Sequence, residues 1–153
     1  MRECLAIARA AARGGDEPFG ALLVADGRIL LEGRNSALTS RDRTGHAELN
    51  LVRAASRDLD PEIIARSTLY ASTEPCAMCA GAIYWIGIPE VVYGCPAETL
   101  GALAGGSLVI PCRLVFGAGR RTVRVIGPVL EPEAIQVHRG HWHRYNPPKG
   151  ETR

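Results

Sequence analysis

Three residues of the chain have the types and the spacing of a zinc site, and a fourth beside them can carry protons. His46 offers an imidazole, and Cys76 and Cys79 offer two sulfurs. Zinc that only holds a fold usually has four protein ligands, whereas catalytic zinc keeps three and leaves the fourth position to water. Glu48 stands two residues after His46 and can act as a general base and acid. The pattern therefore favours a catalytic zinc centre.

The cysteine pair predicts a helix that begins at the metal. Cys76 and Cys79 are three residues apart, which places both sulfurs on one face of a helix. Pro75 is suited to the first helical position. The unpaired amide groups of a helix start favour the thiolate, which is the form that zinc binds.

Glu48 and His46 can share one site only near the start of a helix. Residues two apart point away from each other in mid-helix. Thr44 precedes the apolar run and is the expected N-cap, so both side chains would lie in or near the first turn. There the metal would lower the pKa of its bound water to about 7. Glu48 would take a proton from that water and leave a hydroxide that can attack an electrophilic carbon.

Two other uses of the cysteine pair remain as alternatives. In a structural zinc site, Cys95, Cys112 or a tail histidine would complete the ligand set, which gives Glu48 beside His46 no purpose. In a thioredoxin-like redox site, the pair would follow the first strand of its domain, whereas here it lies in mid-chain.

The remaining cysteines are expected to be small buried side chains. Five cysteines are an odd number, and no secretory signal is visible at the N-terminus, so a disulfide framework is not expected. Cys4, Cys95 and Cys112 stand among apolar neighbours. His138, His141 and His143 form a cluster near the C-terminus that we interpret as surface or packing residues without zinc.

Length and composition predict one globular domain. The chain has 153 residues, and we expect a single domain over residues 1–145 and a polar tail over 146–153. No apolar run approaches the roughly 20 residues of a membrane helix, so we expect a cytoplasmic protein. The net charge of +2 is too small to argue by itself for a nucleic-acid partner.

Hydrophobic periodicity predicts alternating helices and strands without an internal repeat. Helices are expected at 3–13, from 46 onward, at a short turn after 61, and at 76–86 and 131–138. Strands are expected at 20–25, 28–33, 68–73, 90–94 and 122–127, with a candidate wall of the site in the loop 35–45. For residues 100–111 the pattern does not separate a short helix from a loop. The unit of strand, helix and strand around Cys76 favours parallel pairing, with ligands at the carboxyl ends of the strands.

Two segments make the chain resemble the cytidine deaminase-like superfamily: GHAELNLVRAA and STEPCAMCAGAIYWIGIPEVVYG. They contain the H-x-E and P-C-x-x-C motifs that are typical of zinc-dependent deaminases of bases. The resemblance covers roughly residues 5–127 and is strongest to the purine-acting branch of guanine deaminases and tRNA adenosine deaminases. It implies an α/β fold, a three-layer α/β/α sandwich around a five-stranded mixed sheet. It also implies one Zn2+ per chain held by three protein ligands and water.

The same resemblance implies partners and base contacts. We expect a homodimer in which the neighbouring chain helps to finish each active site, possible exchange of C-terminal segments, and contacts to the base from Asn35 and from the backbone at Ala47. Phe19 and Trp85, in FGALLV and GAIYW, look like residues of guanine deaminases and could stack on a base or belong to the core. Trp142 stands in an aromatic C-terminal segment like the one that closes the pocket of guanine deaminases, and could equally pack the last helix.

The expected activity is hydrolytic removal of an amino group from a free purine base, with guanine giving xanthine and ammonia. The segment GALAGGSL instead resembles the tRNA enzymes, so a tRNA adenosine deaminase is the first alternative. A deaminase of cytosine or another aminated heterocycle, and a structural zinc-binding module without activity, are the others. Two departures from the family pattern predict an altered pocket: Asp-Arg-Thr-Gly at 42–45, and Asn50 where small or apolar residues are commoner.

Overall fold

A five-stranded mixed sheet forms the middle layer of the computed structural model, which describes residues 1–106 and 108–142. The strand order is β2-β1-β3-β4-β5. β1 pairs antiparallel with β2 and β3, whereas β3, β4 and β5 run parallel. The strands are β1 (Gly20–Ala25), β2 (Arg28–Arg34), β3 (Thr68–Thr73), β4 (Glu90–Cys95) and β5 (Arg124–Ile126).

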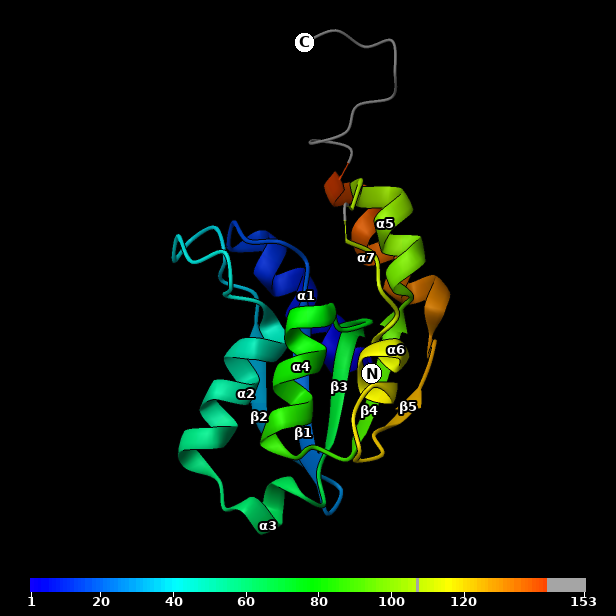
Figure 1. The fold of residues 1–153 in the computed structure, drawn as a ribbon. Coiled ribbons are helices and arrows are strands. Elements are labelled where there is room, and N and C mark those ends of the chain that lie inside the picture. Colours follow the sequence, from blue (N-terminus) through cyan, green and yellow to red (C-terminus); the bar gives the residue numbers. More distant parts are fainter. Residues whose placement is uncertain (107, 143–153) are drawn as a thin grey trace, which may run out of the picture.

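Helices cover both faces of this sheet, as Figure 1 shows. One face carries α2 (Ala47–Asp58), α4 (Ala77–Ile86) and α6 (Cys112–Gly117). The other carries α1 (Arg2–Arg13) and α7 (Glu131–Trp142), with α5 (Ala97–Ala104) beside α7. The short α3 (Pro61–Ile64) links α2 to β3. The predicted three-layer α/β/α sandwich around a mixed sheet is confirmed.

Two turns follow directly from their residues. Asp26 and Gly27, between β1 and β2, both have positive φ values of 52° and 72°. A two-residue hairpin that matches the twist of its strands needs this conformation, and Asp-Gly adopts it readily. Gly87 ends α4 with a φ of 103°, a left-handed conformation that glycine adopts without steric cost. Both turns agree with the sequence prediction.

The C-terminal third differs most from the prediction. Residues 100–104 end α5, residues 105–106 and 108–111 lie outside helices and strands, and α6 follows where no helix was predicted. α6 has only six residues, too few to show helical periodicity. β5 is three residues long, and α7 continues past His138 to Trp142. The predicted tail 146–153 and His143 lie outside the described residues.

The parallel pair β3 and β4 brings two chain segments to one edge of the sheet. Thr73 lies opposite Cys95, so the segments that lead to α4 and to α5 leave the sheet side by side. On the other side of β3, the end of β2 approaches α2 closely: a Cβ atom at Gly33 would collide with the carbonyl oxygen of Ala47. The starts of α2, α4 and α5 therefore converge. Among the described residues, no helix is long and apolar enough to cross a membrane.

Candidate active site

The three predicted metal ligands lie together. Nδ1 of His46 is 3.7 Å from Sγ of Cys76 and 3.6 Å from Sγ of Cys79, and all three ligand atoms lie within 4.8 Å of one another. A tetrahedral zinc ion with ordinary Zn–S and Zn–N bonds requires N···S separations of about 3.6 Å. The donor set and its spacing therefore fit one zinc ion. Within residues 1–106 and 108–142, no fourth histidine, cysteine or acid belongs to this group.

Both ligand-bearing helices begin at the site. His46 is the N-cap of α2 and Cys76 is the N-cap of α4, each with an extended backbone. His46 precedes the helix and Glu48 is its second residue, so the two side chains need not point apart as residues two apart do in mid-helix. The convergence at a helix start was predicted correctly.

Two details of these helix starts were predicted wrongly. Pro75 precedes the N-cap of α4 and is not the first helical residue. Thr44 is not the N-cap of α2, because its hydroxyl instead donates a hydrogen bond to Asp42. In both helices the residue at the cap directs its side chain to the metal group, and no side chain caps the first turn.

The two thiols have opposite shifts of pKa. A hydrogen bond from Cys79, supported by His46, lowers the pKa of Cys76 to about 4. The same hydrogen bond and burial raise the pKa of Cys79. Cys76 also raises the pKa of His46, chiefly by accepting its hydrogen bond. One thiolate is thus already stable at neutral pH, which suits the group for binding a metal cation.

Glu48 is placed to move protons near neutral pH. Its side chain is 6% exposed, and burial raises its pKa to about 7. A carboxyl group with this pKa can both accept and release a proton at pH 7, as a general base and acid must. It faces a cavity of about 90 Å³ beside the metal ligands. That cavity is lined by Phe19, His46, Glu48, Thr73, Glu74, Cys76 and Leu100.

Asn35 offers a buried donor and contacts Phe19, a residue of the cavity wall. It is fully buried just after β2, and its backbone N–H donates to the carbonyl of Phe19 at 3.2 Å. Its Oδ1 accepts from the N–H of Ala37 at 3.0 Å, whereas Nδ2 has no partner among the described residues. A buried donor without a partner is costly unless a ligand completes it. Ala47, the other predicted base contact, is the first residue of α2, between His46 and Glu48.

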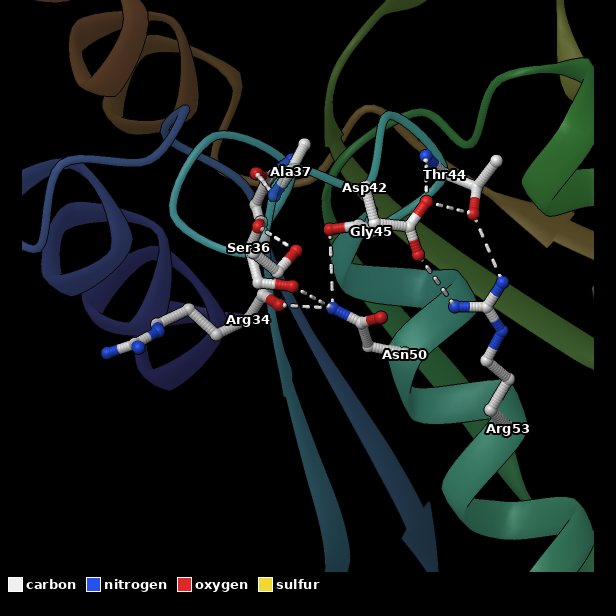
Figure 2. Close-up of polar contacts among 10 residues, drawn as sticks. Arg34, Ser36, Ala37, Asp42, Thr44, Gly45, Asn50 and Arg53 are labelled. Atoms are coloured by element: carbon white, nitrogen blue, oxygen red, sulfur yellow. Dashed lines mark hydrogen bonds and ion pairs between the residues drawn. The ribbon is translucent and has the colours of Figure 1, made fainter.

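Asn50 and Arg53 tie the loop of residues 35–45 to α2, as Figure 2 shows. Nδ2 of Asn50 lies 2.9 Å from the carbonyl oxygen of Arg34, 3.0 Å from Oγ of Ser36 and 3.2 Å from the carbonyl oxygen of Gly45. Arg53 reaches the hydroxyl of Thr44 at 3.1 Å and the carboxylate of Asp42 at 3.6 Å. The two departures from the family pattern thus form one clasp that holds the loop after Asn35.

The C-terminal helix reaches the cavity wall through Trp142 and His138. The indole Nε1 of Trp142 donates to Nδ1 of His138 at 3.3 Å, and its ring centroid lies 6.3 Å from that of Phe19. Nε2 of His138 lies 2.7 Å from the hydroxyl of Thr73. Phe19 and Thr73 both line the cavity, so Trp142 contacts its wall. Sequence reasoning treated His138 only as a packing residue, although its spacing of four from Trp142 on a helix could have indicated the contact.

Trp85, which was predicted to contact the base, does not line the cavity beside the metal ligands in the described part of the chain. It is 85% exposed on α4 and lines a separate hollow together with Val52, Arg53 and Ile86. Its neighbour Tyr84 lies under the guanidinium of Arg121, 4.6 Å from the ring centroid.

Two residues of the cavity wall were not predicted from the sequence, and three cysteines elsewhere were predicted to be packing residues. Glu74 and Leu100 line the cavity, and neither stands in a spacing that reveals this. Cys4, Cys95 and Cys112 are buried, as predicted.

Comparison with known proteins agrees with this geometry. The family model for the cytidine and deoxycytidylate deaminase zinc-binding region matches residues 1–95. A probable cytosine deaminase of Schizosaccharomyces pombe is 36% identical over 150 residues, which are 93% of this chain and 90% of that protein. The guanine deaminase of Bacillus subtilis is 46% identical over 88 residues, 58% of this chain and 56% of that relative. Proteins described as tRNA-specific adenosine deaminases are also among the relatives.

The fold agrees with that of a solved deaminase. The structure of the guanine deaminase from Nitrosomonas europaea matches with a TM-score of 0.76 at 23% identity, covering 91% of this chain and 80% of that one. The family match covers the helix starts that carry His46, Glu48, Cys76 and Cys79. The chain therefore belongs to the family of zinc-dependent cytidine and deoxycytidylate deaminases and is an enzyme of that family.

Proposed function

We propose that this deaminase acts on a free purine base and converts guanine to xanthine and ammonia. The observation that carries the proposal is the size and lining of the cavity beside the zinc ligands. It measures about 90 Å³, whereas pockets for drug-sized ligands are typically roughly 300–1,000 Å³. A cavity this small suits a single planar base better than a base with its sugar and phosphate.

The residues of the cavity can divide the reaction among them. Zinc held by His46, Cys76 and Cys79 would lower the pKa of a water molecule to about 7 and so supply a nucleophile. Glu48 would carry the first proton of this water to the ring nitrogen, and the second, from the hydroxyl of the attacked carbon, to the departing amine. Atoms balance because water replaces the amino group and ammonia leaves.

Asn35 and Phe19 are proposed to hold the base. The unpartnered Nδ2 of Asn35 can donate to a carbonyl oxygen or ring nitrogen of the base. Phe19 presents an aromatic ring at the cavity wall, and Trp142 supports that ring from behind. The similarity to the B. subtilis guanine deaminase, 46% identical over 88 residues, supports guanine as the substrate.

A panel assay tests the substrate proposal. Zinc-loaded protein would be incubated with guanine, guanosine, adenine, cytosine, cytidine and tRNA, with ammonia release as the readout. We expect the highest kcat/KM for guanine, with guanosine and related aminated heterocycles below it. Cytosine is the second candidate because the S. pombe relative matches over nearly its whole length. A clear preference for tRNA would overturn the proposal, and zinc binding without ammonia release from any substrate would indicate a binding module.

We further propose that two chains form a homodimer through the exposed face of α4. Met78 is 38% exposed and Trp85 is 85% exposed on this helix, and their spacing of seven residues places these two large apolar side chains on one face. A second copy packed here would bury Trp85 and could bring it near the partner's base. Sedimentation of the parent and of Trp85→Glu tests the proposal: the parent should be a dimer and the variant a monomer. A monomeric parent would contradict it.

A further inference from the structure

Glu74 joins the segment before the zinc ligands to the starts of two helices. It follows β3 directly, and only 8% of its surface is exposed. Its Oε2 accepts a hydrogen bond from the backbone N–H of Ala97 at 3.1 Å, and its Oε1 accepts one from the N–H of Cys112 at 2.9 Å. Ala97 is the first residue of α5, and Cys112 is the first residue of α6. One buried carboxylate thus binds both helices.

Both helices need an acceptor from elsewhere in the chain. The first N–H groups of any helix lack a partner within it, and a side chain at the N-cap usually supplies one. The N-cap residues here are Pro96 and Pro111, and proline has no side-chain oxygen. Glu74 therefore supplies the hydrogen-bond acceptor that Pro96 and Pro111 cannot supply to α5 and α6. Its negative charge also complements the positive ends of the two helix dipoles.

The start of α5 matters because this helix carries a wall of the cavity. Leu100, its fourth residue, lines the 90 Å³ cavity beside His46 and Glu48. Leu100 also lines a second cavity of about 110 Å³, whose other lining residues come mainly from α5, from Gly106 and from residues 108–110. The second cavity is lined mainly by Ala, Leu, Val, Ile and Gly residues. The two cavities share only Glu74, Cys76 and Leu100.

The other contacts that hold α5 are only partly buried, such as that of Leu100 with the small cluster of Leu5, Cys95 and Ala134. None of its residues is buried, although it packs beside α7 beyond the end of the sheet, as Figure 1 shows. A helix with few buried contacts depends more than others on the hydrogen bonds at its ends. The bond from Ala97 to Glu74 is such a contact, and it lies one turn before Leu100.

We propose that Glu74 is a positioning residue that sets α5, and with it Leu100, as the wall between the metal cavity and the apolar cavity, and that this wall excludes purines with alkyl groups on the ring. The role of the wall in substrate choice rests on the proposed purine deaminase function. The role of Glu74 in holding α5 stands independently of the substrate.

Glu74→Gln tests the positioning role, with Glu98→Gln as the matched control. The amide has nearly the shape of the carboxylate but can accept at only one of its two ends. Its oxygen should stay with the buried N–H of Cys112, because that donor is costlier to leave without a partner than the partly buried N–H of Ala97, so the start of α5 loses its acceptor. Glu98 also lies in the first turn of α5 but is exposed. We expect Glu74→Gln to retain its zinc, to keep kcat within about twofold and to raise KM about tenfold, since the wall acts on binding and not on the proton transfers.

Hydrogen exchange gives a readout that does not depend on activity. The backbone amides of α5 should exchange about tenfold faster in Glu74→Gln than in the parent, whereas those of α2 should not change. Glu98→Gln should match the parent in zinc content, KM and exchange. Unchanged exchange in α5, or loss of zinc from Glu74→Gln, would overturn the positioning role, because the residue would then support nothing or would support Cys76.

Leu100→Ala tests the wall itself while Glu74 remains in place. Removal of this side chain should join the two cavities, and the ratio of kcat/KM for a ring-alkylated purine to that for the unsubstituted base should rise about tenfold. An unchanged ratio with measurable turnover would refute the wall. No ammonia from any purine, in the parent as well as the variant, would instead refute the proposed function, and the exchange data would still decide the role of Glu74.

Discussion

Acid should destabilise this protein through one buried histidine. His138 is fully buried, and burial, with a smaller effect of His141, lowers its pKa to about 4. The indole of Trp142 can only donate, so Nδ1 of His138 accepts and carries no proton. The proton of the neutral ring then lies on Nε2, which donates to the hydroxyl of Thr73. The folded protein therefore keeps this ring neutral at pH values where an exposed histidine is charged.

The two pKa values define the size and the pH range of the effect. In the unfolded chain the pKa of His138 is about 6.5, so the unfolded state binds more protons than the folded state between pH 6.5 and pH 4. The stability from the neutral ring is complete above pH 6.5 and is lost as the pH falls through this window. Linkage gives a loss of about 2 kcal/mol at pH 5 and about 3 kcal/mol at pH 4.

Urea unfolding at pH 7.5 and pH 5 measures this loss, with His138→Gln as the comparison. Glutamine stays neutral at both pH values and can still donate and accept, whereas other groups that titrate in this range, such as His46, are common to both proteins. Both would be measured at the same excess of zinc. The free energy of unfolding of the parent should fall by about 2 kcal/mol more than that of the variant. Equal losses in the two proteins would refute the reasoning.

Three further substitutions test the site. Glu48→Ala should retain one zinc per chain and lower turnover by about 10²–10⁴-fold or more, because the carboxylate moves protons and is not a ligand; loss of the metal would contradict its role. Trp142→Ala should raise KM for guanine about tenfold at unchanged zinc content, because Phe19 loses its aromatic neighbour, and unchanged turnover and affinity would show that Trp142 does not help to close the pocket. Asn50→Ala should lower the free energy of unfolding by about 1 kcal/mol in urea, since the exposed acceptor at Arg34 and the partly buried acceptors at Ser36 and Gly45 lose their donor; a stability equal to that of the parent would show that the clasp is not needed.

The zinc ligands were predictable from the sequence because metal binding restricts residue type and local spacing together. A helix start at Cys76 is enough to bring the sulfurs of Cys76 and Cys79 together. A helix start at His46 is enough to bring His46 and Glu48 to one site. The strand, helix and strand unit around Cys76 fixed the parallel pairing of β3 and β4 by general rules of chain connection. The hairpin at Asp26 followed from the conformation that Asp-Gly favours.

Contacts between distant segments could not be predicted in the same way. Ala97 and Cys112 stand 23 and 38 positions after Glu74 in the sequence, and only the folded chain brings them into contact with it. Short helices such as α6 show no period that separates them from loops. Trp85 is of a residue type that often stacks on bases. Its exposed position on α4 depends on how that helix packs, which the sequence does not show.

The most direct test of the account is X-ray absorption at the zinc edge of the purified protein. The account predicts one zinc per chain with two sulfur neighbours at about 2.3 Å, one imidazole nitrogen at about 2.0 Å and one oxygen from water. Two sulfurs with two imidazoles, or three or four sulfurs, would mean that a fourth protein ligand closes the site. That result would contradict the central claim that this zinc centre keeps one position for hydrolysis.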